Sequence, residues 1–191
     1  MIRNFDLFCN LNRIIKSDFS LFLDSVNSLS PFRQICPSCG AIHTCSLYAH
    51  YNRDMIALED SLPKVYSVTI PRLLCSSCGH THAFLPACLI PYGSYSLFFI
   101  LTVLRLYFLR SYTVENLCIR FSISVSTLYA WIHLFYRQKS LWLGVLKDSS
   151  TSSLGFLSLL WDWDFFLEQF FLKSASSFLQ PFRFTAHSGL P

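Results

Sequence analysis

The pattern of hydrophobic and polar positions predicts three short strands in the first half of the chain. Residues 41–51 and 64–74 are rich in alternating, β-branched and aromatic side chains, and the pair Leu62-Pro63 separates them. A third strand is predicted over residues 81–85. We therefore expect a small antiparallel sheet.

Helical patterns are predicted on both sides of these strands. Residues 1–30 predict an N-terminal helical segment, with an amphipathic helix over 7–15 and a second apolar piece over 19–26. Residues 96–110 carry apolar side chains at nearly every turn, and the segment 86–95 before them, with two prolines and a glycine, predicts a linker. The expected fold class is α+β.

Residues 113–139 predict two helices joined by a short turn. Thr113 caps a first helix that ends near Phe121, and Ser124 caps a second helix that runs to about Lys139. Apolar residues and one small residue occupy the locking positions of a helix-turn-helix: Leu117, Cys118, Phe121, Ile123, Leu128 and Trp131. Residue 122 is serine where glycine is commoner, which predicts slight strain in the turn. A plain helical hairpin of another all-α domain is the alternative.

Two nearly identical motifs, CPSCG and CSSCG, frame the first two predicted strands. In each, two cysteines at Cys-x-x-Cys spacing can reach one tetrahedral ion at about 2.3 Å, while the following glycine adopts a positive φ. The predicted ligands are Cys36, Cys39, Cys75 and Cys78. The sequence thus predicts a structural Zn²⁺ in a zinc ribbon over residues 31–90, with one metal-binding knuckle at each turn. Such a module is too small to fold without its ion.

Other roles for these four cysteines fit the sequence less well than a shared metal site. A disulfide within either motif would close a very small ring, and a redox-active pair predicts one motif at a helix start rather than two matched copies. A mixed site is a further alternative, because alternation places His43 and Cys45 on one strand face. Residues near the motifs that compete as ligands are Cys45, His43, His50, His80 and His82.

The composition restricts the class of protein but does not indicate its function. Of the 191 residues, 52% are hydrophobic and 14% are charged, which predicts packed cores rather than disorder. The net charge of +4 permits contact with nucleic acid but does not by itself indicate it. The longest apolar runs contain charged residues and fall short of a membrane span, and we find no signal peptide at the N-terminus. We expect a cytoplasmic protein without a membrane partner.

The predicted second helix leaves small and polar residues on its outer face, as a helix that enters a major groove requires. Ser126 and Thr127 can contact base edges or phosphate, and Val125 and Ala130 can meet thymine methyl groups. The complete set of expected DNA-binding residues is Ser124, Val125, Ser126, Thr127, Tyr129, Ala130 and His133, with Arg120, Arg137 and Lys139 on phosphates.

Residues 36–135, with the two cysteine motifs, THAFLP, PYGSYS and the predicted helix-turn-helix, resemble an uncharacterised bacterial domain family of transposase-like proteins. They resemble more distantly the N-terminal zinc-binding and helix-turn-helix part of insertion-sequence transposases. The resemblance implies that the four motif cysteines bind metal and that the helix from Ser124 reads DNA. Such transposases continue into a long catalytic domain with three dispersed acidic residues, for which we expect no room before Pro191.

Residues 141–191 predict an aromatic helical segment after a polar linker. Its acidic residues Asp162, Asp164 and Glu168 are expected to be solvated positions of a packing helix, because a two-metal nuclease site needs carboxylates from separate elements. This segment is also the expected contact with a protein partner or a second copy of the chain.

The expected function is that of a non-enzymatic, zinc-dependent protein that binds double-stranded DNA. It combines the ribbon at 31–90 with a helix-turn-helix module at 91–140, as a transposase-like protein without a catalytic domain. It would be a free-standing binder or the relic of a mobile element. The alternatives are a protein-interaction module and the DNA-recognition subunit of a split transposase.

Overall fold

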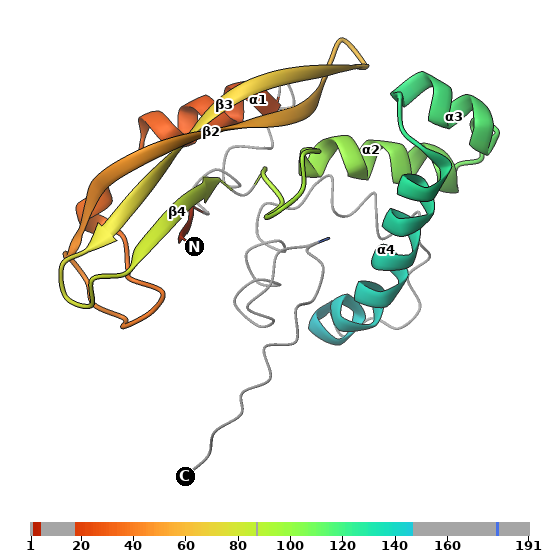
Figure 1. The fold of residues 1–191 in the computed structure, drawn as a ribbon. Helices are drawn as coiled ribbons and strands as arrows, with labels where there is room; N and C mark the ends of the chain where they lie inside the picture. The colour runs from red at the N-terminus through yellow and green to blue at the C-terminus, as the bar shows by residue number, and fades with distance from the viewer. Residues whose placement is uncertain (1, 5–17, 87, 147–178, 180–191) are drawn as a thin grey trace.

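A computed structural model describes residues 2–4, 18–86, 88–146 and 179. The elements, in chain order, are β1 (Ile2–Asn4), α1 (Asp18–Asn27), η2 (Pro31–Arg33), β2 (Cys45–Glu59), β3 (Leu62–Cys75), β4 (Thr81–Pro86), α2 (Leu97–Phe108), α3 (Val114–Phe121) and α4 (Val125–Leu146). The fold is α+β, as predicted, with the sheet on one side and α2, α3 and α4 on the other (Figure 1).

The sheet has the strand order β1-β4-β3-β2. β2 and β3 form a long antiparallel hairpin, and β4 pairs antiparallel with β3, so the three predicted strands form an antiparallel sheet. β1 adds a short parallel strand beside β4, within a segment that we expected to be entirely helical. The predicted helix over 7–15 lies outside the described residues, whereas the apolar piece over 19–26 is indeed helical, in α1.

The predicted bounds of the first strand, 41–51, were wrong, whereas the second strand, predicted over 64–74, is only slightly longer in β3. β2 starts at Cys45 and continues to Glu59, and the turn is formed by Asp60 and Ser61, whose φ angles are +50° and +64°. Two consecutive left-handed residues match the twist of a tight hairpin. Pro63 lies inside β3, in a stretch where β4 does not pair with β3, which is the kind of strand position that tolerates proline.

Residues 88–96 are packed against the sheet and α2 rather than forming an exposed linker. Cys88, Leu89 and Ile90 are buried. The Ile56 N–H donates to the Ser94 carbonyl at 2.7 Å, and the Ser96 N–H donates to the Ile56 carbonyl at 2.8 Å. These two bonds attach the chain before α2 to the outer edge of β2, so the sheet positions the helices.

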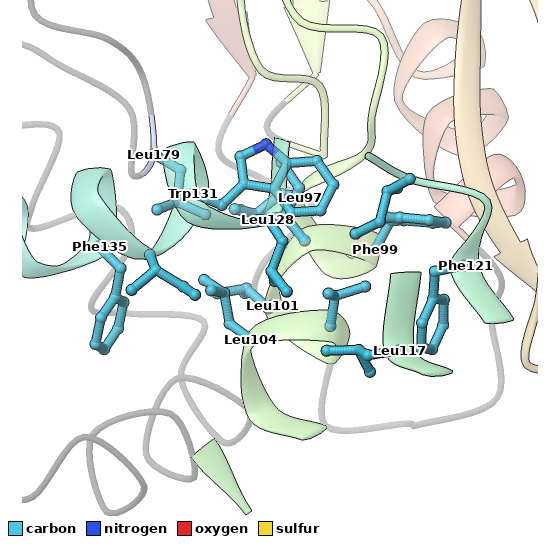
Figure 2. Packing of buried hydrophobic residues seen from close by; sticks show 14 of the residues in the cluster. Leu97, Phe99, Leu101, Leu104, Leu117, Phe121, Leu128, Trp131, Phe135 and Leu179 are labelled. Carbon is cyan, nitrogen blue, oxygen red and sulfur yellow. The ribbon is translucent and has the colours of Figure 1, made fainter. Parts of the chain in front are cut away.

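Side chains of α2, α3 and α4 form the largest buried apolar cluster. Figure 2 shows leucines of α2 lying between side chains of α3 and those of α4. The labelled members are Leu97, Phe99, Leu101, Leu104, Leu117, Phe121, Leu128, Trp131, Phe135 and Leu179. Ile56 and Leu58, near the tip of the β2–β3 hairpin, also pack against this cluster. The hairpin therefore extends from the cysteine motifs to the helices.

The local predictions for α3 and α4 are confirmed. The Thr113 hydroxyl accepts from the Asn116 N–H at 3.3 Å, and the Ser124 hydroxyl accepts from the Thr127 N–H at 3.0 Å. α3 ends at Phe121, and all six locking residues are buried. Ser122 adopts φ +50°, the left-handed conformation that glycine would accept with less strain. α4 continues beyond Lys139 to Leu146.

The chain turns by 104° between Val114–Phe121 and Val125–Gln138. Within the described residues, no single helix is long and apolar enough to cross a membrane, and these two helices meet that criterion only when they are taken together across their bend.

A buried carboxyl group joins α1 to α2. The Ser96 hydroxyl donates to the Asp18 carboxylate, and the Ser96 hydroxyl oxygen accepts from the Phe99 N–H at 3.1 Å. Burial raises the pKa of Asp18 to about 6, although the hydrogen bond from Ser96 opposes this shift. The N-terminal turn of α2 is thus satisfied through a side chain that is itself bonded to α1.

We expect Asp18→Asn to change how stability depends on pH. Because the folded-state pKa lies above the unfolded value of about 3.8, ionisation costs the native state stability as pH rises through this window. Between about pH 5 and pH 7.5, the wild type should lose about 1–1.5 kcal/mol relative to the variant. Urea unfolding of both proteins at the two pH values measures this difference, and parallel pH dependences would contradict it.

Candidate metal centre and candidate nucleic-acid surface

The structure brings the four predicted cysteine ligands together. The Sγ atoms of Cys36, Cys39, Cys75 and Cys78 all lie within 4.8 Å of one another. The Cys36–Cys78 pair is separated by 3.7 Å and the Cys39–Cys75 pair by 3.8 Å. A tetrahedral ion with bonds of about 2.3 Å requires sulfur atoms about 3.8 Å apart. The separations therefore suit a tetrahedral metal site, and each short pair joins one motif to the other.

Both motifs fold in the same way, which explains why their sulfur atoms converge. The Gly40 N–H donates to the Cys36 carbonyl at 2.8 Å, and the Gly79 N–H donates to the Cys75 carbonyl at 2.9 Å. Both glycines have a φ of +71°. A side chain would strain this left-handed backbone, so the glycine is what permits each short loop to turn behind its cysteines.

The two motifs do not both lie at turns of the sheet, and this part of the ribbon prediction was wrong. The second motif connects β3 to β4, but the first precedes β2. The β2–β3 turn is Asp60-Ser61 at the other end of the hairpin. The reason is the length of β2, which carries the chain from the sulfur cluster to the helical part before it turns back.

Polar neighbours surround the sulfur cluster. His82 is buried, and its Nε2 lies 3.4 Å from the Cys36 Sγ. The Thr44 hydroxyl lies 3.2 Å from the Cys75 Sγ. Cys45 is buried directly across the hairpin from Cys75. His82 is among the residues that the sequence predicts near the site, whereas Thr44 is not predicted, because residue spacing contains no signal for it.

The alternative mixed site does not form in the part of the chain that the structure describes, where the four motif cysteines are the one group with metal-ligand spacing. His43 is directed to the Phe32 carbonyl at 3.0 Å and stacks on the Phe32 ring. His50 and His80 are exposed. All described cysteines are free thiols, so no disulfide competes with metal binding among them.

The thiol groups resist ionising together without a cation. The hydrogen bond from Thr44, with further bonds from the backbone near Cys78, lowers the pKa of Cys75 to about 6 against the effect of desolvation. The backbone N–H of His80 lowers the pKa of Cys78, but burial and hydrogen bonds with the other three thiols outweigh it and raise the pKa to about 12. A bound metal ion must therefore displace protons from this cluster.

The residues proposed for DNA contact lie along one side of α4 and at its start. Among these, Ser124, Val125, Ser126, Tyr129, Ala130, His133 and Arg137 are exposed, as is Arg120 at the end of α3. Thr127 is half-buried, and the Lys139 side chain lies outside the described residues. The Ser124 hydroxyl is 2.8 Å from the hydroxyls of both Ser126 and Thr127. The Arg120 guanidinium lies 5.6 Å from the Tyr112 ring centre.

The arrangement defines a class, namely α+β proteins in which two cysteine motifs form one cluster that can hold a metal ion. The chain belongs to the family described as Domain of unknown function (DUF6431), whose model matches residues 36–131, just over half of the chain. The match includes all four clustered cysteines and the first part of α4. No curated protein and no solved structure matches the chain.

We expect Cys75→Ser to abolish stoichiometric metal binding, because a hydroxyl replaces one of four converging thiolates. Elemental analysis should find about one Zn²⁺ per wild-type chain, and chelation should reduce the strand signal in far-UV circular dichroism. Cys118→Ala, in the helical cluster, and Cys45→Ala should both retain the metal. Full metal content in Cys75→Ser would refute the four-sulfur site.

The glycine of the first motif supports a separate prediction. A Cβ on Gly40 would meet nothing within 4 Å, so the cost of Gly40→Ala comes from its φ of +71°. We expect a loss of about 1–2 kcal/mol in the free energy of unfolding. A Cβ on Gly93 would lie at an ordinary 3.7 Å from the Ile90 side chain. In Gly93→Ala, the free energy of unfolding should therefore change by no more than about 0.5 kcal/mol. Denaturant titration of both variants, loaded with Zn²⁺, compares them; equal costs would contradict the role of the left-handed turn.

Proposed function

We propose that this protein binds double-stranded DNA through α3 and α4, with a structural Zn²⁺ in the four-cysteine cluster. The observation that carries the proposal is the geometry of the two helices. A three-residue turn joins them, and the chain bends by 104° between them. Helices crossing at about 90–120° across a turn of three or four residues are typical of a helix-turn-helix.

The surface that this geometry exposes is suited to a major groove. The apolar residues that lock the helices are buried, whereas Ser126, Tyr129 and His133 remain exposed along α4. The start of α4 carries three neighbouring hydroxyl groups that can bond phosphate or base edges. Val125, 47% exposed, supplies an apolar contact for a thymine methyl group.

The distribution of charge supports the same surface. Residues 91–140 contain five basic residues and one acidic residue, so this segment has a net charge of +4, equal to that of the whole chain. The basic residues are Arg105, Arg110, Arg120, Arg137 and Lys139, and the acidic one is Glu115. The rest of the chain is balanced. A local excess of positive charge is the electrostatic footprint expected of a phosphate-binding module.

The zinc ribbon would act as a scaffold in this proposal. A site with four sulfur ligands has no open position for water or substrate, so the ion would stabilise the fold rather than perform chemistry. The hairpin that starts at the cluster reaches the helices through Ile56 and Leu58, so loss of the metal would loosen the support of α2 and α3. The likeness to the DNA-recognition part of insertion-sequence transposases supports a transposase-like, non-catalytic role.

A second candidate is a protein-interaction module. It is favoured by an apolar surface around the first cysteine motif, where large side chains are between 51% and 61% exposed. They are Phe32, Ile35, Ile42, Leu47 and Tyr48. Salt separates the two candidates, because phosphate binding weakens steeply with ionic strength and an apolar interface does not.

Selection from random oligonucleotides with the Zn²⁺-loaded protein should yield a preferred duplex. On that duplex, Arg137→Ala should weaken binding about equally for preferred and scrambled sequences and reduce the salt slope by about one. Ser126→Ala should instead change the preference between sequences. Arg33→Ala and Ser67→Ala, two exposed residues of the sheet part, are matched controls. Fluorescence anisotropy at several salt concentrations measures these effects, and salt-independent binding or identical losses on every sequence would exclude groove reading by α4.

A further inference from the structure

A hollow of about 490 Å³ opens between α4 and the segment that precedes α2. One wall is formed by residues 90–93 and Tyr95, and the opposite wall includes Ala130, His133 and Arg137 of α4. Trp131 and Ile100 contribute to it from the helical cluster. Its volume lies within the range of roughly 300–1,000 Å³ typical of small-molecule sites. No pattern in the sequence predicts this hollow.

Tyr92 stands out on the rim of this hollow. Its side chain is 79% exposed, and its φ is +64°, a conformation that a bulky residue rarely adopts. Such strain persists where the surrounding structure imposes it and is concentrated at functional sites. Here Arg53 donates to the carbonyls of Gly93 and Ile90, which ties the loop to β2. The exposed ring is therefore presented on an anchored loop.

The chemistry of the walls favours a planar group that carries negative charge. Tyr92, Tyr95 and Trp131 supply aromatic surface, and the Tyr95 and Trp131 rings already pack edge to face with centres 4.9 Å apart. His133 and Arg137 provide cationic or hydrogen-bonding groups, and the described lining contains no acidic side chain. A nucleobase attached to a phosphate combines these two properties, since bases stack on aromatic rings and arginine pairs with phosphate.

A neighbouring hollow of about 550 Å³ shares Pro91, Tyr92 and Gly93 but lacks this character. Its lining includes the acidic Asp54. Because an acidic side chain lines this neighbouring hollow and none is among the described lining of the hollow beside α4, a negatively charged ligand fits the hollow beside α4 better.

We propose that the hollow beside α4 binds one unpaired nucleotide of the DNA that α4 contacts, with its base stacked on Tyr92 and its phosphate held by Arg137. This inference rests on the proposed function and deepens it. Ala130, His133 and Arg137 belong both to the DNA-contacting side of α4 and to the hollow, so a nucleotide displaced from the helix would enter without leaving the protein surface. The preferred partner is thus duplex DNA with an extrahelical or terminal unpaired base.

The experiment compares two labelled duplexes by fluorescence anisotropy, namely the selected duplex and the same duplex with one extrahelical adenine next to the contacted site. Four Zn²⁺-loaded full-length proteins are used: wild type, Tyr92→Phe, Tyr92→Asn and Tyr48→Ala. Asparagine tolerates the left-handed backbone but removes the ring, and phenylalanine keeps the ring. Tyr48 is a matched control, 60% exposed on the sheet.

Wild type, Tyr92→Phe and Tyr48→Ala should bind the bulged duplex more tightly than the paired one. Tyr92→Asn should lose this preference, by roughly 5- to 150-fold in affinity for the bulged duplex, the loss that one base–aromatic stack produces. Its affinity for the paired duplex should be unchanged. No preference in the wild type, or an intact preference in Tyr92→Asn, would overturn the proposal.

Equilibrium dialysis with free dAMP tests whether the hollow takes a free nucleotide or a nucleotide that is part of DNA. Weak binding that requires the Tyr92 ring, together with the bulge preference, supports the assignment. Binding of dAMP without any bulge preference would overturn the DNA source. If the wild type binds neither duplex, the proposed DNA-binding function fails as well, whereas binding of the paired duplex without a bulge preference overturns this inference alone.

Discussion

The convergence of four sulfur atoms is the constraint on which the other parts of this protein depend. Two short loops, separated along the chain mainly by the β2–β3 hairpin, place thiols about 3.7–3.8 Å apart across the cluster. Without a cation these groups compete for protons, as the opposite pKa shifts of Cys75 and Cys78 indicate. A metal ion bound by the four sulfur atoms would end that competition and would fix the ends of β2, β3 and β4 relative to the first motif.

The β2–β3 hairpin connects the sulfur cluster to the helices, because Ile56 and Leu58 near its tip pack against the helical cluster. Two backbone hydrogen bonds at Ile56 hold the segment before α2, and Arg53 binds the carbonyls of the loop that bears Tyr92. Asp18 completes the connection by bonding Ser96, the residue that caps α2. The metal site, the helical surface and the hollow beside α4 therefore lie on one connected scaffold. Through this connection, a metal ion held by the four cysteines would support the helical surface without touching it.

The helices α2, α3 and α4 form the end of the scaffold far from the sulfur cluster (Figure 1). The bend between α3 and α4 exposes polar residues at the start of α4, and the excess positive charge of the chain lies in the same segment. The exposed apolar side chains near the first cysteine motif lie on the sheet part, away from the polar residues at the start of α4.

Features with local causes could be predicted from the residues alone. Cys-x-x-Cys-Gly spacing specified the two knuckles, and hydroxyl caps at Thr113 and Ser124 with apolar spacing specified α3 and the start of α4. Tertiary structure decided what depends on distant partners. The length of β2 could not be predicted, because residues 52–59 are stabilised by β3 and the helices rather than by a clear alternation. β1 pairs only with β4, which is far from it in sequence. The loop that lines one wall of the hollow is bonded to Arg53 of β2, a contact that no local pattern in the sequence records.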